Sequence, residues 1–203
     1  MTRFVRFDVL TWWHAGTGRG DGAALDAVVH RTAEGLPFLP GRTVKGLLRD
    51  AFQLAEHCQR VAAGRTNRWF GTPPPPTDAD DREQKLEESR FDSVPGALTF
   101  SNAELGDAVT GPQWRRWAAL HRKERSALFD ALAATRIDAN GVCMDHTLRT
   151  IEVAVPMALR GRIDGPDDPE WVTDLGTALP LIRNLGTGRT RGLGRVLATL
   201  EDR

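Results

Sequence analysis

Two stretches of the chain alternate apolar and polar positions, which is the period of a half-buried β-strand. In the first, from Arg3 to Leu10, positions 5, 7 and 9 are apolar. In the second, from Ile151 to Ile163, every odd position is apolar or glycine, whereas Glu152 and the arginines point the other way. Pro156 lies inside this second stretch and predicts an edge position or a bulge. Shorter strands are predicted at 97–101 and 196–200.

Apolar residues at helical spacing predict three helices between these strands. The first is predicted from Val44 to Val61, with Thr43 available as its N-cap. A second, peripheral helix with many charges is predicted over 112–134. The third is predicted over 171–182, with Pro169 near its first turn.

The order of the core elements is strand, helix, strand, strand, helix, strand. This order predicts an α+β fold with a ferredoxin-like (RRM-like) βαββαβ core and long insertions. We expect residues 1–203 to form a single domain, because a chain of this length can bury a core of its own. Four consecutive prolines followed by a charged run predict an exposed insertion at about 72–92. The sheet leaves one face open, and RNA-recognition domains use that face or the loops around it.

Net charge excludes an overall positive field. Lysine and arginine number 27, as do aspartate and glutamate, so a surface for nucleic acid must come from segregated charge. Charge is segregated: acidic residues dominate 78–92, whereas 183–195 contains none. No stretch approaches the ~20 apolar residues of a membrane span, and the N-terminus lacks the apolar core of a signal peptide, so we expect a cytoplasmic protein without a membrane partner. Its two cysteines, Cys58 and Cys143, fit a reducing compartment.

Glycine and arginine alternate in the segment 184–195, here called the Gly/Arg loop. Glycine lets a backbone approach a ligand closely, and the planar guanidinium of arginine matches phosphate oxygens. The segment therefore predicts a phosphate cradle, although a glycine-rich turn before a last strand also has this composition.

A second element of this kind is LPFLPGRTVKGLLR, residues 36–49. Here a turn enters a helix whose N-terminal N–H groups favour an anion, and Lys45 and Arg49 lie four residues apart on its polar side. The spacing is that of neither a P-loop nor a dinucleotide fingerprint. Phosphate capture is one interpretation, and an ordinary helix start with solvated basic residues is the other.

Four blocks of the sequence resemble the RAMP superfamily of CRISPR-associated proteins. Residues 36–49 resemble its "LPYIPGSSLKGxLR" signature, and 185–196 resemble its C-terminal glycine-rich loop. Residues 135–138 with 148–152 are similar to the segments that flank the thumb hairpin in backbone subunits of type III effector complexes. Phe70-Gly71 with 96–100 resembles another block. The resemblance implies a thumb-like β-hairpin within a helical and thumb insertion at about 106–147.

The resemblance implies a backbone subunit of a type III effector ribonucleoprotein, which acts in antiviral defence and grips CRISPR RNA without reading its sequence. The implied partners are CRISPR RNA, target RNA, other RAMP subunits and a large polymerase-like subunit. Arg42 and Thr43 replace the usual serine pair, and Arg42 adds a charge where a backbone phosphate would sit. The implied RNA-binding residues are Arg42, Thr43, Lys45, Arg49, Arg136, Arg189, Arg191, Arg195, Gly186, Gly188 and Gly192.

Asp26 is the candidate catalytic residue. In type III backbone subunits an aspartate shortly before the signature is required for metal-dependent cleavage of target RNA, and Asp26 matches it. An ionised aspartate holds Mg²⁺ or Mn²⁺ through oxygen or takes up a proton, as an endonuclease requires. An aspartate in a glycine-rich loop also forms turns and caps.

Two other functions stay open. One is a non-catalytic structural or capping subunit of the same complex. The other is a metal-independent RNA-processing endoribonuclease that uses His14 as an acid or base, although a histidine beside two tryptophans also packs or forms hydrogen bonds. Structural zinc is not expected, because the candidate ligands form two separate pairs, His57 with Cys58 and Cys143 with His146.

Overall fold

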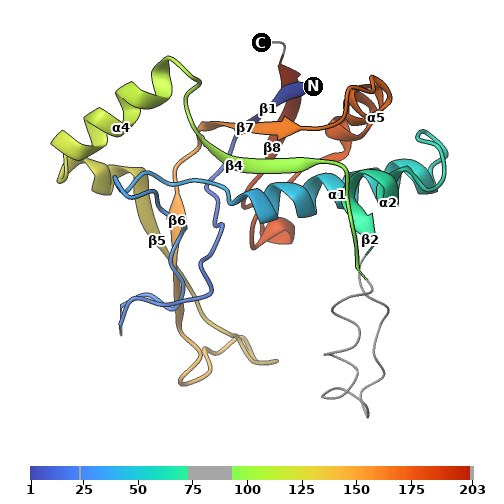
Figure 1. Cartoon of the computed structure of the whole chain (residues 1–203). Helices are drawn as coiled ribbons and strands as arrows, with labels where there is room; N and C mark the ends of the chain where they lie inside the picture. The colour runs from blue at the N-terminus through green and yellow to red at the C-terminus, as the bar shows by residue number, and fades with distance from the viewer. Residues whose placement is uncertain (23, 73–92, 202–203) are drawn as a thin grey trace.

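The computed structural model describes residues 1–22, 24–72 and 93–201, and the structural statements below concern these residues (Figure 1). The fold is mixed α/β with antiparallel sheets. The insertion predicted at about 72–92 lies almost entirely outside the described residues. Within them, no helix has the length and apolar character needed to cross a lipid bilayer.

A four-stranded antiparallel sheet organises the molecule, in the order β4-β7-β1-β8. In β1, Val5, Phe7 and Val9 are buried on one face, as their alternation predicts. The intervening residues of β1 lie on the opposite face, called the open face below. The strands are β1 (Thr2–Val9), β4 (Thr99–Leu105), β7 (Ala158–Asp164) and β8 (Val196–Glu201).

Two helices, α1 (Gly41–His57) and α5 (Glu170–Ala178), contribute their apolar stripes to the core. In α1, Val44, Leu48 and Phe52 are buried at helical spacing, as predicted. α5 stops before Pro180, and the chain continues as a short 3₁₀ helix. The remaining helices are α2 (Arg65–Phe70), α4 (Thr110–Leu120), η2 (Glu124–Leu128), η3 (Leu179–Leu181) and η4 (Arg189–Arg191).

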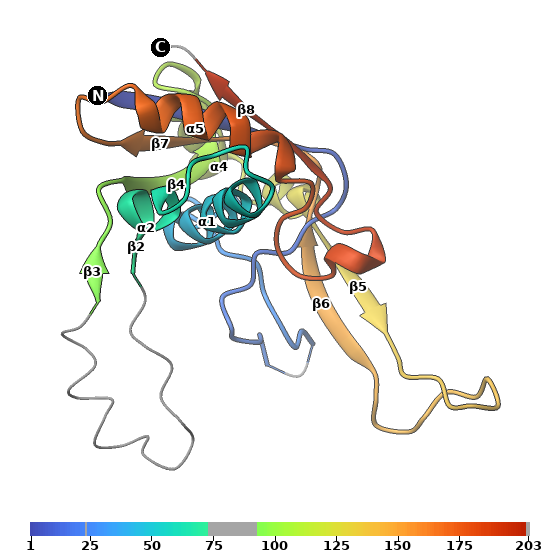
Figure 2. The same ribbon diagram turned by 90° about the vertical axis from the view of Figure 1, so that its right-hand side faces the viewer.

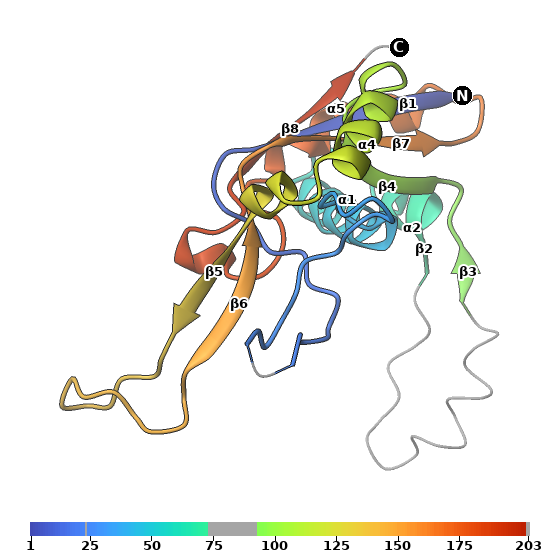
Figure 3. The same cartoon turned by 90° about the vertical axis from the view of Figure 1, so that its left-hand side faces the viewer.

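A two-stranded hairpin extends away from the body of the molecule, on the side of the sheet where α1 lies (Figures 2 and 3). It consists of β5 (Phe129–Ala134) and β6 (Arg149–Ala154), which pair antiparallel. At its base, Trp13 forms a bridge with Ala154, and Ala27 forms one with Ile151. These bridges hold the segment 11–31 against β6. A small sheet pairs β2 (Gly71–Thr72) with β3 (Val94–Pro95).

Three local predictions are wrong. Thr43 is not the N-cap, since α1 begins at Gly41 after Pro40. The helix predicted over 112–134 ends at Leu120, and 129–134 form β5, because pairing with β6 outweighs the helix propensity of that alanine-rich stretch. The long strand predicted over 151–163 is divided into β6 and β7, and the break includes Pro156, which has no N–H to donate to a ladder.

Candidate nucleic-acid interface

Asp26 is exposed in the segment that runs along β6. Its backbone N–H donates to the Thr150 carbonyl (2.8 Å), and its Oδ2 accepts from the Thr150 N–H (2.7 Å). The other carboxylate oxygen, Oδ1, takes part in none of the hydrogen bonds formed among the described residues. One oxygen therefore fixes the loop to β6, and the other is available to a ligand.

His14 is buried at the base of the hairpin and is 3 % exposed. Its Nδ1 lies 2.5 Å from the carbonyl oxygen of Glu152, which can only accept, so Nδ1 carries the proton. Its Nε2 faces the backbone at Gly16, where a β-carbon would overlap the ring. The surroundings of His14 therefore match the packed, hydrogen-bonded histidine that the sequence allowed as an alternative.

Glu152 is a buried carboxylate that the sequence pattern assigned to the outward side of its strand. It is 5 % exposed beneath the 11–31 segment. Its Oε2 accepts from the Val29 N–H (3.0 Å), and its Oε1 pairs with Arg31, whose guanidinium lies 3.8 Å from the centre of the Phe129 ring. This pairing joins the segment 11–31 to both strands of the hairpin. The one feature of the sequence that indicates this burial is a single acidic residue in a mostly apolar predicted strand.

The glycines of the Gly/Arg loop have different structural roles. Gly186 and Gly194 adopt positive φ, and a β-carbon on either would overlap a backbone carbonyl, that of His14 or Leu185. At Gly188 a β-carbon would crowd Leu193, whereas at Gly192 it would meet nothing within 4 Å. Close packing of the protein itself therefore explains Gly186 and Gly194, and positive φ alone explains Gly192.

The Gly/Arg loop lies against the N-terminal segment and α1. The Thr187 N–H donates to the His14 carbonyl (2.9 Å), and the Gly194 N–H donates to the Trp12 carbonyl (2.8 Å). Arg189 and Leu47 line a common cavity of about 320 Å³. The two elements predicted to bind phosphate are therefore neighbours in the fold.

The predicted RNA-binding arginines are mostly exposed. Arg42, Arg136, Arg189, Arg191 and Arg195 are exposed, whereas Lys45 and Arg49 are half-buried along α1. Within the described part of the chain, none of these seven residues forms a salt bridge. Arg136 lies apart from the others, beyond the end of β5.

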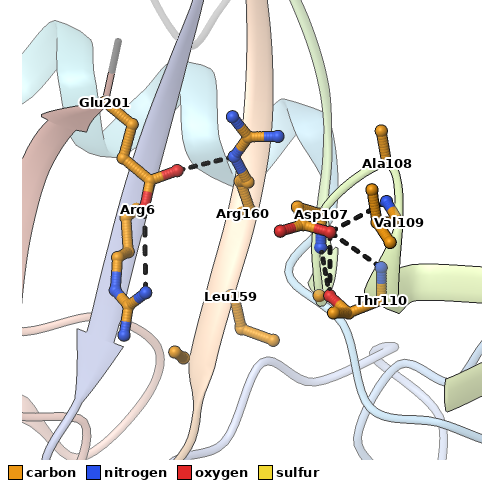
Figure 4. Close-up of a pocket in the computed structure, with 10 residues that line it drawn as sticks. Arg6, Asp107, Ala108, Val109, Thr110, Leu159, Arg160 and Glu201 are labelled. Atoms are coloured by element: carbon orange, nitrogen blue, oxygen red, sulfur yellow. Dashed lines mark hydrogen bonds and ion pairs between the residues drawn. The ribbon is translucent and has the colours of Figure 1, made fainter. Parts of the chain in front are cut away.

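The open face of the sheet carries arginines that are paired with acidic residues (Figure 4). Arg160 donates to Glu201 (2.6 Å) and lies over the Phe4 ring at 3.7 Å, while Arg6 pairs with Asp8 (2.8 Å). Arg6, Arg160 and Glu201 line a cavity of about 620 Å³, together with the turn that follows β4. In that turn, hydrogen bonds from Thr110 and Val109 lower the pKa of Asp107.

Metal ligands are sparse. No group of three or more His, Cys, Asp or Glu side chains is placed to hold an ion among residues 1–22, 24–72 and 93–201. His57 and Cys58 lie at the end of α1, whereas Cys143 and His146 lie beyond the ends of β5 and β6. A cation at Asp26 would therefore need further oxygen ligands from RNA or water, a donor set that suits Mg²⁺.

Chains of two solved structures resemble this fold. One solved chain, from the "Cryo-EM structure of the Type III-B Cmr-beta bound to cognate target RNA", has a TM-score of 0.68 and 12% identity, covering 98% of this chain and 97% of that one. A chain of a "Type IV-B CRISPR Complex" has a TM-score of 0.58 and 14% identity, covering 99% and 90%. At these identities the likeness is one of fold.

The sequence itself matches the family description "RAMP superfamily" over residues 6–197. The chain therefore belongs to the RAMP superfamily, as its motifs predict. No curated protein sequence matches it significantly.

Proposed function

We propose that this chain is a backbone subunit of a type III CRISPR effector ribonucleoprotein that grips guide RNA. In this proposal residues 1–203 form one domain with a ferredoxin-like core, and the β5–β6 hairpin is its thumb. The strand order β4-β7-β1-β8 and the helices that follow β1 and β7 support such a core. Its partners would be CRISPR RNA, target RNA, other RAMP subunits and a large polymerase-like subunit.

One observation carries the proposal: backbone hydrogen bonds join the Gly/Arg loop, the segment 11–31 and the hairpin into one surface. The contacts run from Thr187 to His14, from Trp13 to Ala154 and from Asp26 to Thr150. Exposed arginines and an exposed carboxylate therefore occupy one continuous piece of structure. Binding to phosphates would be independent of sequence, and the guide would supply recognition by base pairing.

Asp26 is proposed to support cleavage of the paired target RNA. Attack by a 2′-hydroxyl on the adjacent phosphate needs in-line alignment, removal of a proton and stabilisation of developing charge. A bound Mg²⁺ or Mn²⁺ would supply the charge stabilisation. Asp26 would hold that ion through Oδ1, while its bond to Thr150 keeps the carboxylate oriented. The arginines of the surface would hold the strand in place.

The test is Asp26→Asn in the assembled, guide-loaded complex. Asparagine retains an oxygen that can accept from Thr150 but loses the charge, so target cleavage should fall by at least about 100-fold with guide binding unchanged. Asp167→Asn is the control, because it removes the same charge from an exposed acid before α5, outside the surface proposed to bind RNA. Equal cleavage by Asp26→Asn and the original complex would remove Asp26 from the mechanism.

A non-catalytic structural or capping subunit is the second candidate function, favoured by the bond between Asp26 and Thr150 and by the sparse acids. It predicts intact assembly without cleavage at this subunit's position. Metal-independent cleavage through His14 has less support, since its ring is buried. Cleavage by the isolated chain in EDTA that disappears in His14→Ala would favour that third function.

A further inference from the structure

A cavity of about 740 Å³ opens between the segment 16–31 and the start of α1. Arg31 and Glu152, which line it, neutralise each other. Arg19 and Arg42 then face one exposed acid, Asp21, so the remaining lining charge is positive. The charged or titratable residues that line the cavity are Arg19, Asp21, His30, Arg31, Arg42 and Glu152.

His30 contacts Arg42 directly in this cavity. Nη2 of Arg42 lies 3.3 Å from Nε2 of His30. A guanidinium can only donate, so Nε2 accepts and the proton of neutral His30 is on Nδ1. The His30 ring packs against Phe38 with centroids 5.5 Å apart, and the backbone N–H of His30 donates to the Ala15 carbonyl (3.0 Å). A fixed, neutral imidazole thus orients Arg42.

Burial lowers the pKa of His30 below its ordinary value of 6.5, and the charges of Arg42 and His14 lower it further. Among the charged groups that line the cavity, Asp21 and Glu152 are the two that favour the protonated form, and Glu152 is already paired with Arg31. His30 is therefore neutral in the empty cavity at neutral pH.

We propose that this cavity binds a phosphate group of an RNA chain through Arg42 and Arg19, and that His30 is the positioning residue that aims Arg42 at it. The inference rests on the proposed function. It adds a second phosphate site, separate from the one proposed at the Gly/Arg loop. Arginine forks match phosphate oxygens and donate paired hydrogen bonds. The phosphate belongs to the guide or to the target strand.

Protonation of His30 would disrupt this arrangement. In the imidazolium form Nε2 carries a proton and no longer accepts from Arg42, and the positive charge repels the guanidinium, so affinity should fall as the pH falls below 6.5, the ordinary pKa of the imidazole. At higher pH His30 is neutral, and affinity no longer depends on its protonation. A histidine with a purely structural role would leave the affinity flat with pH.

The experiment measures the affinity of the full chain for fluorescein-labelled single-stranded RNA between pH 5.5 and 8 at constant ionic strength. Arg42→Ala should weaken binding about tenfold and lower the salt slope by about 0.7, the value of one phosphate contact. His30→Gln still offers Arg42 an acceptor, so its affinity at pH 8 should stay within about twofold of the original, while the fall in affinity at low pH disappears.

Controls are Arg60→Ala and His57→Gln, both exposed at the far end of α1, which should keep the original affinity and pH profile. To identify the strand, the complex is loaded with guide first. If Arg42→Ala then weakens only target capture, the phosphate is the target's, and if it weakens guide loading, the phosphate is the guide's.

Two outcomes separate this inference from the proposed function. If Arg189→Ala weakens RNA binding while Arg42→Ala and His30→Gln match the original chain in affinity, salt slope and pH profile, the cavity is not a phosphate site and the proposed function stands. If the unmodified chain binds no RNA, alone or in the assembled complex, both are overturned.

Discussion

The two sides of the sheet present arginine in different ways. On the open face, Arg160 is paired with Glu201 and Arg6 with Asp8. On the side of α1 and the hairpin, Arg42 and Arg189 project from loops or a helix start and form no salt bridge within the described chain. A phosphate on the open face would have to displace a carboxylate, whereas one on the α1 side would not. Charge pairing therefore distinguishes these two groups of arginines.

The largest expected effect is on stability at the hairpin base. Glu152→Ala removes a buried carboxylate and leaves the Val29 N–H without its partner, so unfolding free energy should fall by about 3 kcal/mol. Glu201→Ala, which breaks a more exposed pair on the open face, should cost about 1 kcal/mol or less. Urea denaturation followed by tryptophan fluorescence measures both. Equal losses would mean that the two faces do not differ in this way.

The second prediction concerns the glycines that shape the Gly/Arg loop. Gly186→Ala combines a positive φ with overlap against the His14 carbonyl and should cost about 2 kcal/mol. Gly192→Ala has the strained φ without the overlap and should cost about 1 kcal/mol. Thermal unfolding in the absence of RNA compares them. A larger loss for Gly192→Ala would contradict the packing described for this loop.

A third prediction tests which face binds RNA. Replacing Arg189 and Arg191 together by alanine should weaken binding to every guide sequence alike, by about tenfold, and lower the salt slope by about 1.4 for two phosphate contacts. Replacing Arg160 and Arg162 together removes the same charge from the open face and should leave both quantities unchanged. Fluorescence anisotropy at several salt concentrations provides the measurement. The reverse pattern would move the interface to the open face.

The smallest expected effect is a pH dependence of stability that comes from His30. Its pKa is lowered in the folded state, so the unfolded chain binds more protons and stability decreases as the pH falls below about 6.5. At higher pH His30 is neutral in both states and contributes no slope. His30→Gln should reduce the loss between pH 7 and pH 5 relative to the original chain, as measured by urea denaturation. An identical loss in both chains would show that other groups are responsible.

The core was predictable from sequence, whereas the contacts of the site were predictable only in part. The periods of β1 and α1 are regular, and each buries the stripe that its pattern marks. β5 was missed because pairing with β6, the other strand of the hairpin, decides its conformation. The burial of Glu152 depends on the 11–31 segment, which has no regular period, and the pairing of His30 with Arg42 is a contact of the same tertiary kind.

The central position of β1 has a consequence for synthesis of the protein. Phe4 lies opposite Arg162 of β7 on one side and Glu201 of β8 on the other, so the first strand made lacks one of its two partners until the last described strand has left the ribosome. The Gly/Arg loop likewise meets Trp12 and His14 only at that stage. Contacts this distant in sequence slow folding. The surface proposed to hold RNA is therefore completed only after translation of β8, and a nascent chain would not capture guide RNA there before that point.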